Sequence, residues 1–151
     1  METVPSGVHV AQIAVGPPDR IVGAPNLGAG TVLVAIGKGV TEVTFTNART
    51  GFIEICKQAR GPGVTGSSQF SFAGQTQTVP VGSCGPATEV PVGTLTITET
   101  FQAGTALVAC ATLPAADLVS CDLPSQSAKV KVKPGDVSTQ TVVTFTNRHT
   151  G

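Results

Sequence analysis

The phrase VTFTNARTG occupies residues 43–51, and the phrase VTFTNRHTG occupies residues 143–151. In both, valine, phenylalanine and asparagine alternate with threonine, which is the period-two pattern of a strand with one buried face. A strand that recurs one hundred residues later indicates that the chain contains at least part of one structural unit twice.

The two phrases belong to a longer internal sequence similarity. Glu2-Thr3 and Glu99-Thr100 each precede a glycine five residues after the glutamate, then an apolar segment and a turn that contains proline. Both copies continue through a valine-rich segment to the repeated phrase, with an offset that drifts from 97 to 100. We therefore interpret residues 1–50 as the second half of a repeat and residues 51–151 as a complete repeat.

The complete repeat is predicted to contain strands only. Short segments with partial period-two alternation are separated by turn signals such as GPG, AGT and PGD. No segment has the periodicity of an amphipathic helix, so the pattern favours an all-β sandwich. The predicted strands cover residues 52–59, 68–73, 75–81, 93–101, 105–112, 117–122, 127–133 and 138–147.

Charge and hydropathy exclude two classes of partner. The formal net charge is zero and 12% of residues are charged, whereas nucleic-acid binding needs clustered lysine and arginine. The one basic run, KVKVK at residues 129–133, is predicted to be the solvent-facing side of a strand. No apolar stretch approaches the ~20 residues that span a bilayer. No secretory leader follows Met1, and we expect a mature or truncated form.

The four cysteines form neither a CxxC motif nor a cluster with histidine at ligand spacing, so we expect no metal and no cofactor. An even count without a metal pattern indicates disulfides and an oxidising, extracellular or cell-surface location. Four buried free thiols are the alternative. Of the three pairings we prefer Cys110–Cys121, which flanks a hairpin-like turn, and Cys56–Cys84.

Three predicted strands each place one polar residue in line with apolar neighbours. A buried, unpaired charge is costly, but an amine and a carboxylic acid in apolar surroundings both favour their neutral forms. A protonated carboxyl could polarise an asparagine carboxamide while the amine attacks it, which would release ammonia and leave an amide. The aligned sets are Ile53, Ile55 and Lys57; Leu95, Ile97, Glu99 and Phe101; and Val143, Phe145 and Asn147.

Two other interpretations remain open for these residues. Lys57 and Asn147 could lie at strand ends with their polar tips in water, with Glu99 hydrogen-bonded nearby. Cys56 directly precedes Lys57, so the strand could instead be fastened by disulfides alone.

The same residues resemble a known family. Apolar-x-apolar-x-Lys in the first strand, Glu-Thr before a glycine turn and Phe-x-Asn in the last strand are similar to CnaB-type domains of bacterial surface proteins and pilins. The resemblance implies an immunoglobulin-like or prealbumin-like β-sandwich in which an amide joins Lys57 to Asn147 and Glu99 is the catalyst. Glu2 and Asn47 would be the counterparts of Glu99 and Asn147 in the half repeat. One departure is that Glu99-Thr100 is not followed by the proline and Gly-Tyr often found in the family.

Half of a sandwich leaves apolar faces and strand edges uncovered. We expect a neighbouring subunit or further residues to complete residues 1–50. The first case is β-strand addition, and a head-to-tail contact that does not close yields an open filament. The sequence thus predicts a self-assembling structural subunit of an extracellular filament, pilus-like fibre or surface stalk, with threonines as candidate sites for O-linked sugar.

The alternative is a monomeric extracellular adhesin or carbohydrate-binding module. Tryptophan and tyrosine, which often form sugar-binding platforms, are both absent. An enzyme acting on an external substrate is not expected, because neither His9 nor His149 belongs to a recognisable set of catalytic residues.

Overall fold

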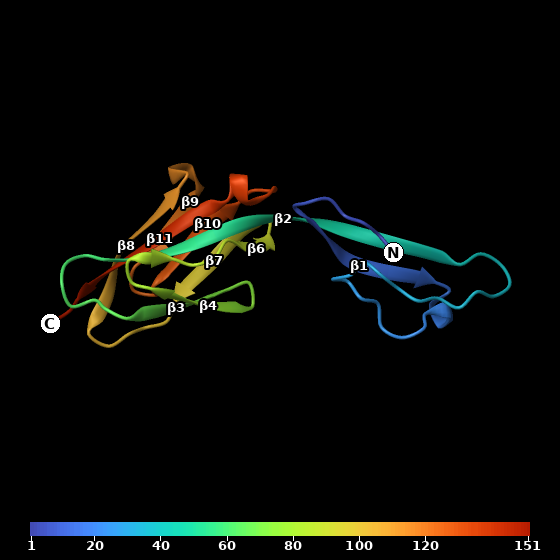
Figure 1. Cartoon of the computed structure of the whole chain (residues 1–151), viewed down its shortest axis with the longest axis horizontal. Helices are drawn as coiled ribbons and strands as arrows, with labels where there is room; N and C mark the ends of the chain where they lie inside the picture. Colours follow the sequence, from blue (N-terminus) through green and yellow to red (C-terminus); the bar gives the residue numbers. More distant parts are fainter. The chain divides into compact units, whose positions relative to one another are not determined.

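The structure is a computed structural model that describes residues Met1–Gly151 and divides them into two compact units, residues 1–50 and residues 51–151. Strands are the main regular structure of both units, and in residues 1–50 a long loop region separates β1 from β2 (Figure 1). The boundary falls within strand β2 (Glu42–Ala59), so each unit contains one part of this strand. No helix in the structure combines the length and the apolar character needed to cross a membrane.

Residues 51–151 form two sheets, as the predicted all-β sandwich requires. The first has the order β2-β11-β8, and the short strands β5 and β6 also pair with β2. The second has the order β4-β3-β7-β10-β9. The bounds of the first sheet are β11 (Thr141–His149), β8 (Thr105–Leu113), β5 (Ser83–Cys84) and β6 (Thr88–Pro91). Those of the second are β4 (Gln75–Pro80), β3 (Ser67–Phe72), β7 (Gly93–Glu99), β10 (Ser127–Val132) and β9 (Leu118–Asp122).

Side chains from both sheets meet in one apolar core. Phe145 from β11 and Phe70 from β3 are fully buried, with ring centroids 4.9 Å apart. Ile97 and Val130 are also fully buried and belong to the same cluster. The lysines of the KVKVK run are exposed while its valines are buried, which confirms the prediction that the lysines form the solvent-facing side of a strand.

Several predicted strand boundaries were wrong, most of them by one residue, and two of the larger errors concern β7 and β11. Strand β7 ends at Glu99, so Phe101 does not share the buried face of Glu99 and is 71% exposed. The last strand begins at Thr141 rather than at residue 138, because Asp136 caps the 3-10 turn η3 (Val137–Thr139). Its Oδ1 accepts a hydrogen bond from Ser138 N at 2.9 Å. The short strands β5 and β6 were not among the predicted elements.

Residues 1–50 contain one strand pair whose register repeats that of β8 with β11. Strand β1 (Val8–Gly16) pairs antiparallel with residues 42–49 of β2. Val10 lies opposite Asn47, as Leu107 lies opposite Asn147, and a bulge adjoins both positions. Residue numbers differ by 97 between β1 and β8 (10 to 107) and by 100 between their partners (47 to 147), which are the offsets present in the sequence.

The turns that flank the strand pair are repeated as well. Thr50 N donates to Gly7 O at 2.7 Å, and Thr150 N donates to Gly104 O at 2.9 Å. Both glycines have a φ of 78°, a left-handed conformation that is strained for residues with a Cβ. The 3-10 turn η1 (Pro18–Arg20) follows β1 as η2 (Ala115–Asp117) follows β8.

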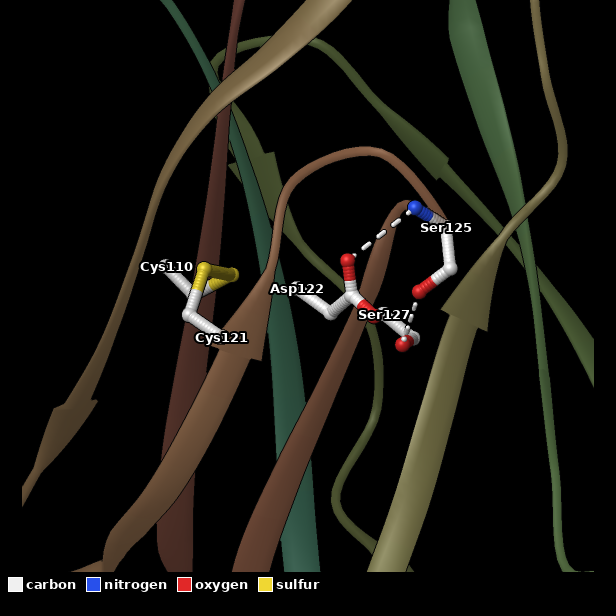
Figure 2. The surroundings of a disulfide bond; sticks show 5 residues. All are labelled: Cys110, Cys121, Asp122, Ser125 and Ser127. Atoms are coloured by element: carbon white, nitrogen blue, oxygen red, sulfur yellow. Dashed lines mark hydrogen bonds between the residues drawn. A yellow bond between two sulfur atoms is a disulfide. The ribbon is translucent and has the colours of Figure 1, made fainter.

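A second repeated turn lies farther along each copy. Asn26 Oδ1 accepts from Ala29 N at 2.9 Å, and Asp122 Oδ1 accepts from Ser125 N at 3.3 Å (Figure 2). The numbers of these residues differ by 96, so Ile36 is the counterpart of Val132. Val132 is 3% exposed and Ile36 is 86% exposed. Residues 1–50 therefore have the strand pair and turns of the complete unit but not the sheet that covers them.

Two disulfides join the pairs preferred from the sequence. Cys56–Cys84 connects β2 to β5 and closes a separation of 28 residues. Cys110–Cys121 connects β8 to β9 and closes a separation of 11 residues (Figure 2). Strands β8 and β9 each end the order of their own sheet. The second disulfide therefore fastens the two sheets together at one side of the sandwich.

Removing the disulfide that closes the longer loop is expected to destabilise the protein more than removing the other disulfide. In the chain-entropy model, replacing Cys56 and Cys84 by alanine lowers the free energy of unfolding by about 4 kcal/mol, and replacing Cys110 and Cys121 lowers it by about 3 kcal/mol. Urea unfolding of each double variant, followed by far-ultraviolet circular dichroism, measures both values. A reversed order would show that packing around the sulfurs outweighs loop closure.

Candidate functional site

Lys57, Glu99 and Asn147 meet inside the core of residues 51–151. Lys57 is 0%, Glu99 2% and Asn147 1% exposed. Lys57 Nζ lies 2.6 Å from Glu99 Oε1, and Asn147 Nδ2 donates to the same oxygen at 3.1 Å. The interpretation that left the tips of Lys57 and Asn147 in water is therefore wrong.

The strand register brings the three side chains to one place. Strands β2 and β11 are parallel neighbours, and Lys57 lies opposite Phe145. Asn147 is two residues beyond Phe145 and so projects from the same face of β11. Glu99 ends β7 in the other sheet, where it lies opposite Phe70 of β3. Each sheet thus contributes part of the site, and the aromatic pair of the core adjoins it.

Burial shifts the pKa of the lysine downward. Removal from water lowers the pKa of Lys57 from its ordinary value of 10.5, and this effect outweighs the hydrogen bond and the charge of Glu99, which act in the opposite direction. The apolar surroundings therefore favour the neutral amine, which is the nucleophilic form.

Two oxygens of the site have no hydrogen-bond partner. Glu99 Oε2 and Asn147 Oδ1 are both buried and unpaired. Buried polar atoms are almost always paired, because an unpaired one costs roughly 1–3 kcal/mol. Lys57 Nζ also has no hydrogen bond of ordinary geometry, so the buried polar groups of this site are not all satisfied.

The half repeat contains the same acidic and amide groups without the amine. Asn47 Nδ2 donates to Glu2 Oε1 at 2.9 Å, matching the contact of Asn147 with Glu99. Glu2 Oε2 is buried without a hydrogen-bond partner, as Glu99 Oε2 is. The only lysine in residues 1–50 is Lys38, and Glu2 takes part in neither ion pair of the structure.

A second buried polar cluster was missed by sequence reasoning. Asp117 Oδ2 accepts from Thr141 Oγ1 at 2.9 Å and lies 2.8 Å from Lys133 Nζ. Burial raises the pKa of Asp117, but hydrogen bonds from Lys133 and Thr141 outweigh it and hold the pKa below its usual value. The corresponding position in residues 1–50 is Arg20, which donates to Thr41. This cluster connects η2 to the start of β11. No local sequence pattern predicts it, because its members are distant in the sequence.

Solved structures with the same fold include a bacterial adhesin from Mobiluncus mulieris that contains intramolecular disulfide, isopeptide and ester bond cross-links. Its two crystal forms are each 18% identical to this chain with a TM-score of 0.54. The matches cover 81% and 87% of this chain, and 52% and 55% of the adhesin chain. This chain therefore spans about half the length of the adhesin chains that it matches.

A mutant of the major pilin from Streptococcus pyogenes also matches, with 11% identity over 99% of this chain and 66% of the pilin. Its TM-score of 0.31 is too low to support any argument. No protein-family model matches the chain, and no curated protein matches it. The likeness to the adhesin shows the fold alone, and the chain accordingly has the β-sandwich fold that its sequence predicts.

Proposed function

We propose that this protein is a structural subunit of a bacterial extracellular filament or surface stalk, and that its complete unit is locked by a self-formed amide between Lys57 and Asn147. The observation that carries the proposal is the approach of Lys57 Nζ and Asn147 Nδ2 to one oxygen of Glu99, at 2.6 Å and 3.1 Å, in a fully buried site.

The reaction needs no cofactor and no external reactant. The neutral Lys57 amine attacks Asn147 Cγ while the protonated Glu99 carboxyl polarises the carboxamide. The Nζ–Cγ bond forms and the Cγ–Nδ2 bond breaks. Glu99 relays a proton from the amine to the leaving nitrogen, so ammonia departs and the carboxyl is restored.

The position of the amide suits a protein under tension. Lys57 is in the first strand of residues 51–151 and Asn147 is in the last, and these strands are parallel neighbours. A pull between the two ends of the unit would pass through the covalent bond. The residues between Lys57 and Asn147 would then bear little of the load. The two disulfides indicate an oxidising location, in agreement with a role outside the cell.

Head-to-tail assembly is the second part of the proposal. Residues 1–50 expose apolar side chains that the complete unit buries, as Ile36 and Val132 illustrate. A strand from a neighbouring subunit would cover this face and pair with its free edge, which is β-strand addition. A contact of this kind between unlike surfaces propagates into a filament when it does not close.

Intact mass after full reduction is expected to be about 17 Da below the value calculated from the sequence, because one ammonia is lost. Lys57→Ala, Asn147→Ala and Glu99→Gln should each remove this deficit, since each deletes one participant. Lys129→Ala is the matched control, because Lys129 is exposed on β10. A full calculated mass for the unsubstituted protein would contradict the amide.

Unfolding of the Asn147→Ala variant is expected to depend on pH through Lys57. Burial lowers the pKa of the free amine below 10.5, so the unfolded chain binds more protons between the lowered pKa and 10.5. The free energy of unfolding therefore rises with pH through this window. The amide of the unsubstituted protein has no such proton, and the rise should be absent there.

Urea midpoints measured from neutral pH to about pH 10 test this dependence. The doubly substituted Lys57→Met/Asn147→Ala protein is the control, because other titrating groups are the same in both variants. An equal rise in the control would show that Lys57 is not its source.

Native material is expected to form regular filaments in negative-stain electron microscopy, with particles far larger than one 15.2 kDa chain. Phe45→Asp should disperse them, because it places a charge on the apolar face of residues 1–50. Phe101→Asp should not, because Phe101 is an exposed side chain of the complete unit. Small isolated particles would instead favour a monomeric adhesin or carbohydrate-binding module.

A further inference from the structure

We propose that Glu2 and Asn47 form an acceptor site for a lysine carried by a strand from another polypeptide segment, and that the site joins this lysine to Asn47 by an amide. The inference rests on the proposed function, because it applies the chemistry proposed for Lys57, Glu99 and Asn147 to the incomplete unit. It identifies residues 1–50 as a covalent docking site rather than only a surface for assembly.

The backbone places Glu2 as it places Glu99. Glu2 N donates to Gly30 O at 2.8 Å, and Glu99 N donates to Gln126 O at 2.8 Å. Gly30 and Gln126 have similar positive φ values, 59° and 53°. Equivalent turns therefore hold the backbones of the two glutamates. Each glutamate carboxyl accepts a hydrogen bond from the asparagine of the repeated phrase that follows it.

The position of the incoming strand follows from the register of the complete unit. There the lysine strand lies beside β11 on the side away from β8, runs parallel to it, and places Lys57 opposite Phe145. Within residues 1–50, β1 is the only strand paired with residues 42–49. A strand parallel to residues 43–47 on the other side would place its lysine opposite Phe45, beside Glu2 and Asn47.

The apolar face defines what else the occupant must carry. Val143 and Phe145 are fully buried, whereas their counterparts Val43 and Phe45 are only partly buried. In the complete unit Val143 and Phe145 belong to one apolar cluster with side chains from β2, β3, β4, β6, β7 and β10. All of these contributions except that of β10 come from residues 51–99. The occupant is therefore a protein segment with the pattern of residues 51–98, including apolar-x-apolar-x-Lys in its first strand.

Docking must precede the covalent step. Asn47 is exposed, whereas Asn147 is buried. Only after the occupant excludes water would its lysine favour the neutral amine, as Lys57 does. The Nζ–Cγ bond to Asn47 then forms, the Cγ–Nδ2 bond breaks, and Glu2 relays a proton to the departing ammonia. No oxidant, reductant or other reactant is needed.

The probe for this site is a polypeptide of residues 51–98 in which Cys56 and Cys84 are replaced by alanine. It is mixed with full-length protein that carries Asn147→Ala, so Asn47 is the only asparagine left in a repeated phrase. Intact mass is measured under reducing, denaturing conditions. A covalent adduct is expected at about 17 Da below the sum of the two masses, with the cross-link mapped to Asn47 and the probe's Lys57.

Three variants that should lose the adduct, and one that should keep it, define its chemistry. Adding Asn47→Ala or Glu2→Gln to the full-length protein should abolish it, as should a probe with Lys57→Ala. Asp19→Asn in the full-length protein should leave the adduct intact, because Asp19 is an exposed acid in η1 and contacts neither Glu2 nor Asn47. An adduct that survives Asn47→Ala would overturn the assignment.

A weakly folded probe is handled by raising its effective concentration. The same polypeptide is fused before Met1 through a flexible linker, which supplies it at about millimolar concentration. Absence of the mass deficit in both formats overturns the acceptor site. If the unsubstituted protein still shows the Lys57–Asn147 deficit, only the acceptor site fails. If that deficit is also absent, the proposed function loses its amide as well.

Discussion

Burial of the Lys57 amine against the Glu99 carboxyl is the constraint on which the rest of the complete unit depends. Taking a charged amine or carboxylate out of water costs several kcal/mol, so a low-dielectric interior holds these two groups only where they meet and can share a proton. Lys57 and Glu99 come from different sheets, and their 2.6 Å contact requires the two sheets to keep one relative position. The contact between Phe70 and Phe145 lies beside this pair and has the same requirement.

Residues 1–50 show which contacts of the site form without the lysine. The Glu2–Asn47 hydrogen bond forms although Glu2 is in no ion pair with a lysine, so it depends on the ladder of β1 with β2 and on the turns that hold Glu2. Carboxyl and carboxamide are thus positioned by local structure alone. Such preorganisation lowers the entropy that a reaction between bound groups would otherwise cost.

Much of this arrangement could be predicted from the sequence, because it depends on period-two alternation and on an internal sequence repeat. The repeated phrase located the unit boundary at residue 50, and alternation aligned Lys57, Glu99 and Asn147 with their buried neighbours. Both disulfide pairs also agree with the preferred pairing. These features need only local pattern and chain order.

What could not be predicted depends on local competition or on distant contacts. The Asp136 side chain draws residues 137–139 into a 3-10 turn, because a short acceptor can satisfy the backbone where a strand partner would otherwise be needed. Phe101 continues the alternation of β7, yet the strand ends at Glu99. The cluster of Asp117, Lys133 and Thr141 joins residues up to 24 positions apart, and neither spacing nor composition marks it.

The distribution of covalent links follows from the weak points of the sandwich. Cys110–Cys121 joins the last strands of the two sheets on one side, where each strand has only one neighbour. On the other side, Lys57 lies in β2, which pairs with the four-residue strand β6 and, at Lys57 itself, with the two-residue strand β5. A strand that short adds few hydrogen bonds, and the adjacent Cys56–Cys84 bond holds it in place. The strand that carries the lysine is thereby secured on its outer edge while β11 secures the inner one. A lysine strand docking on residues 1–50 would meet an inner edge of the same kind, and its outer edge would have to be secured by the segment that brings it.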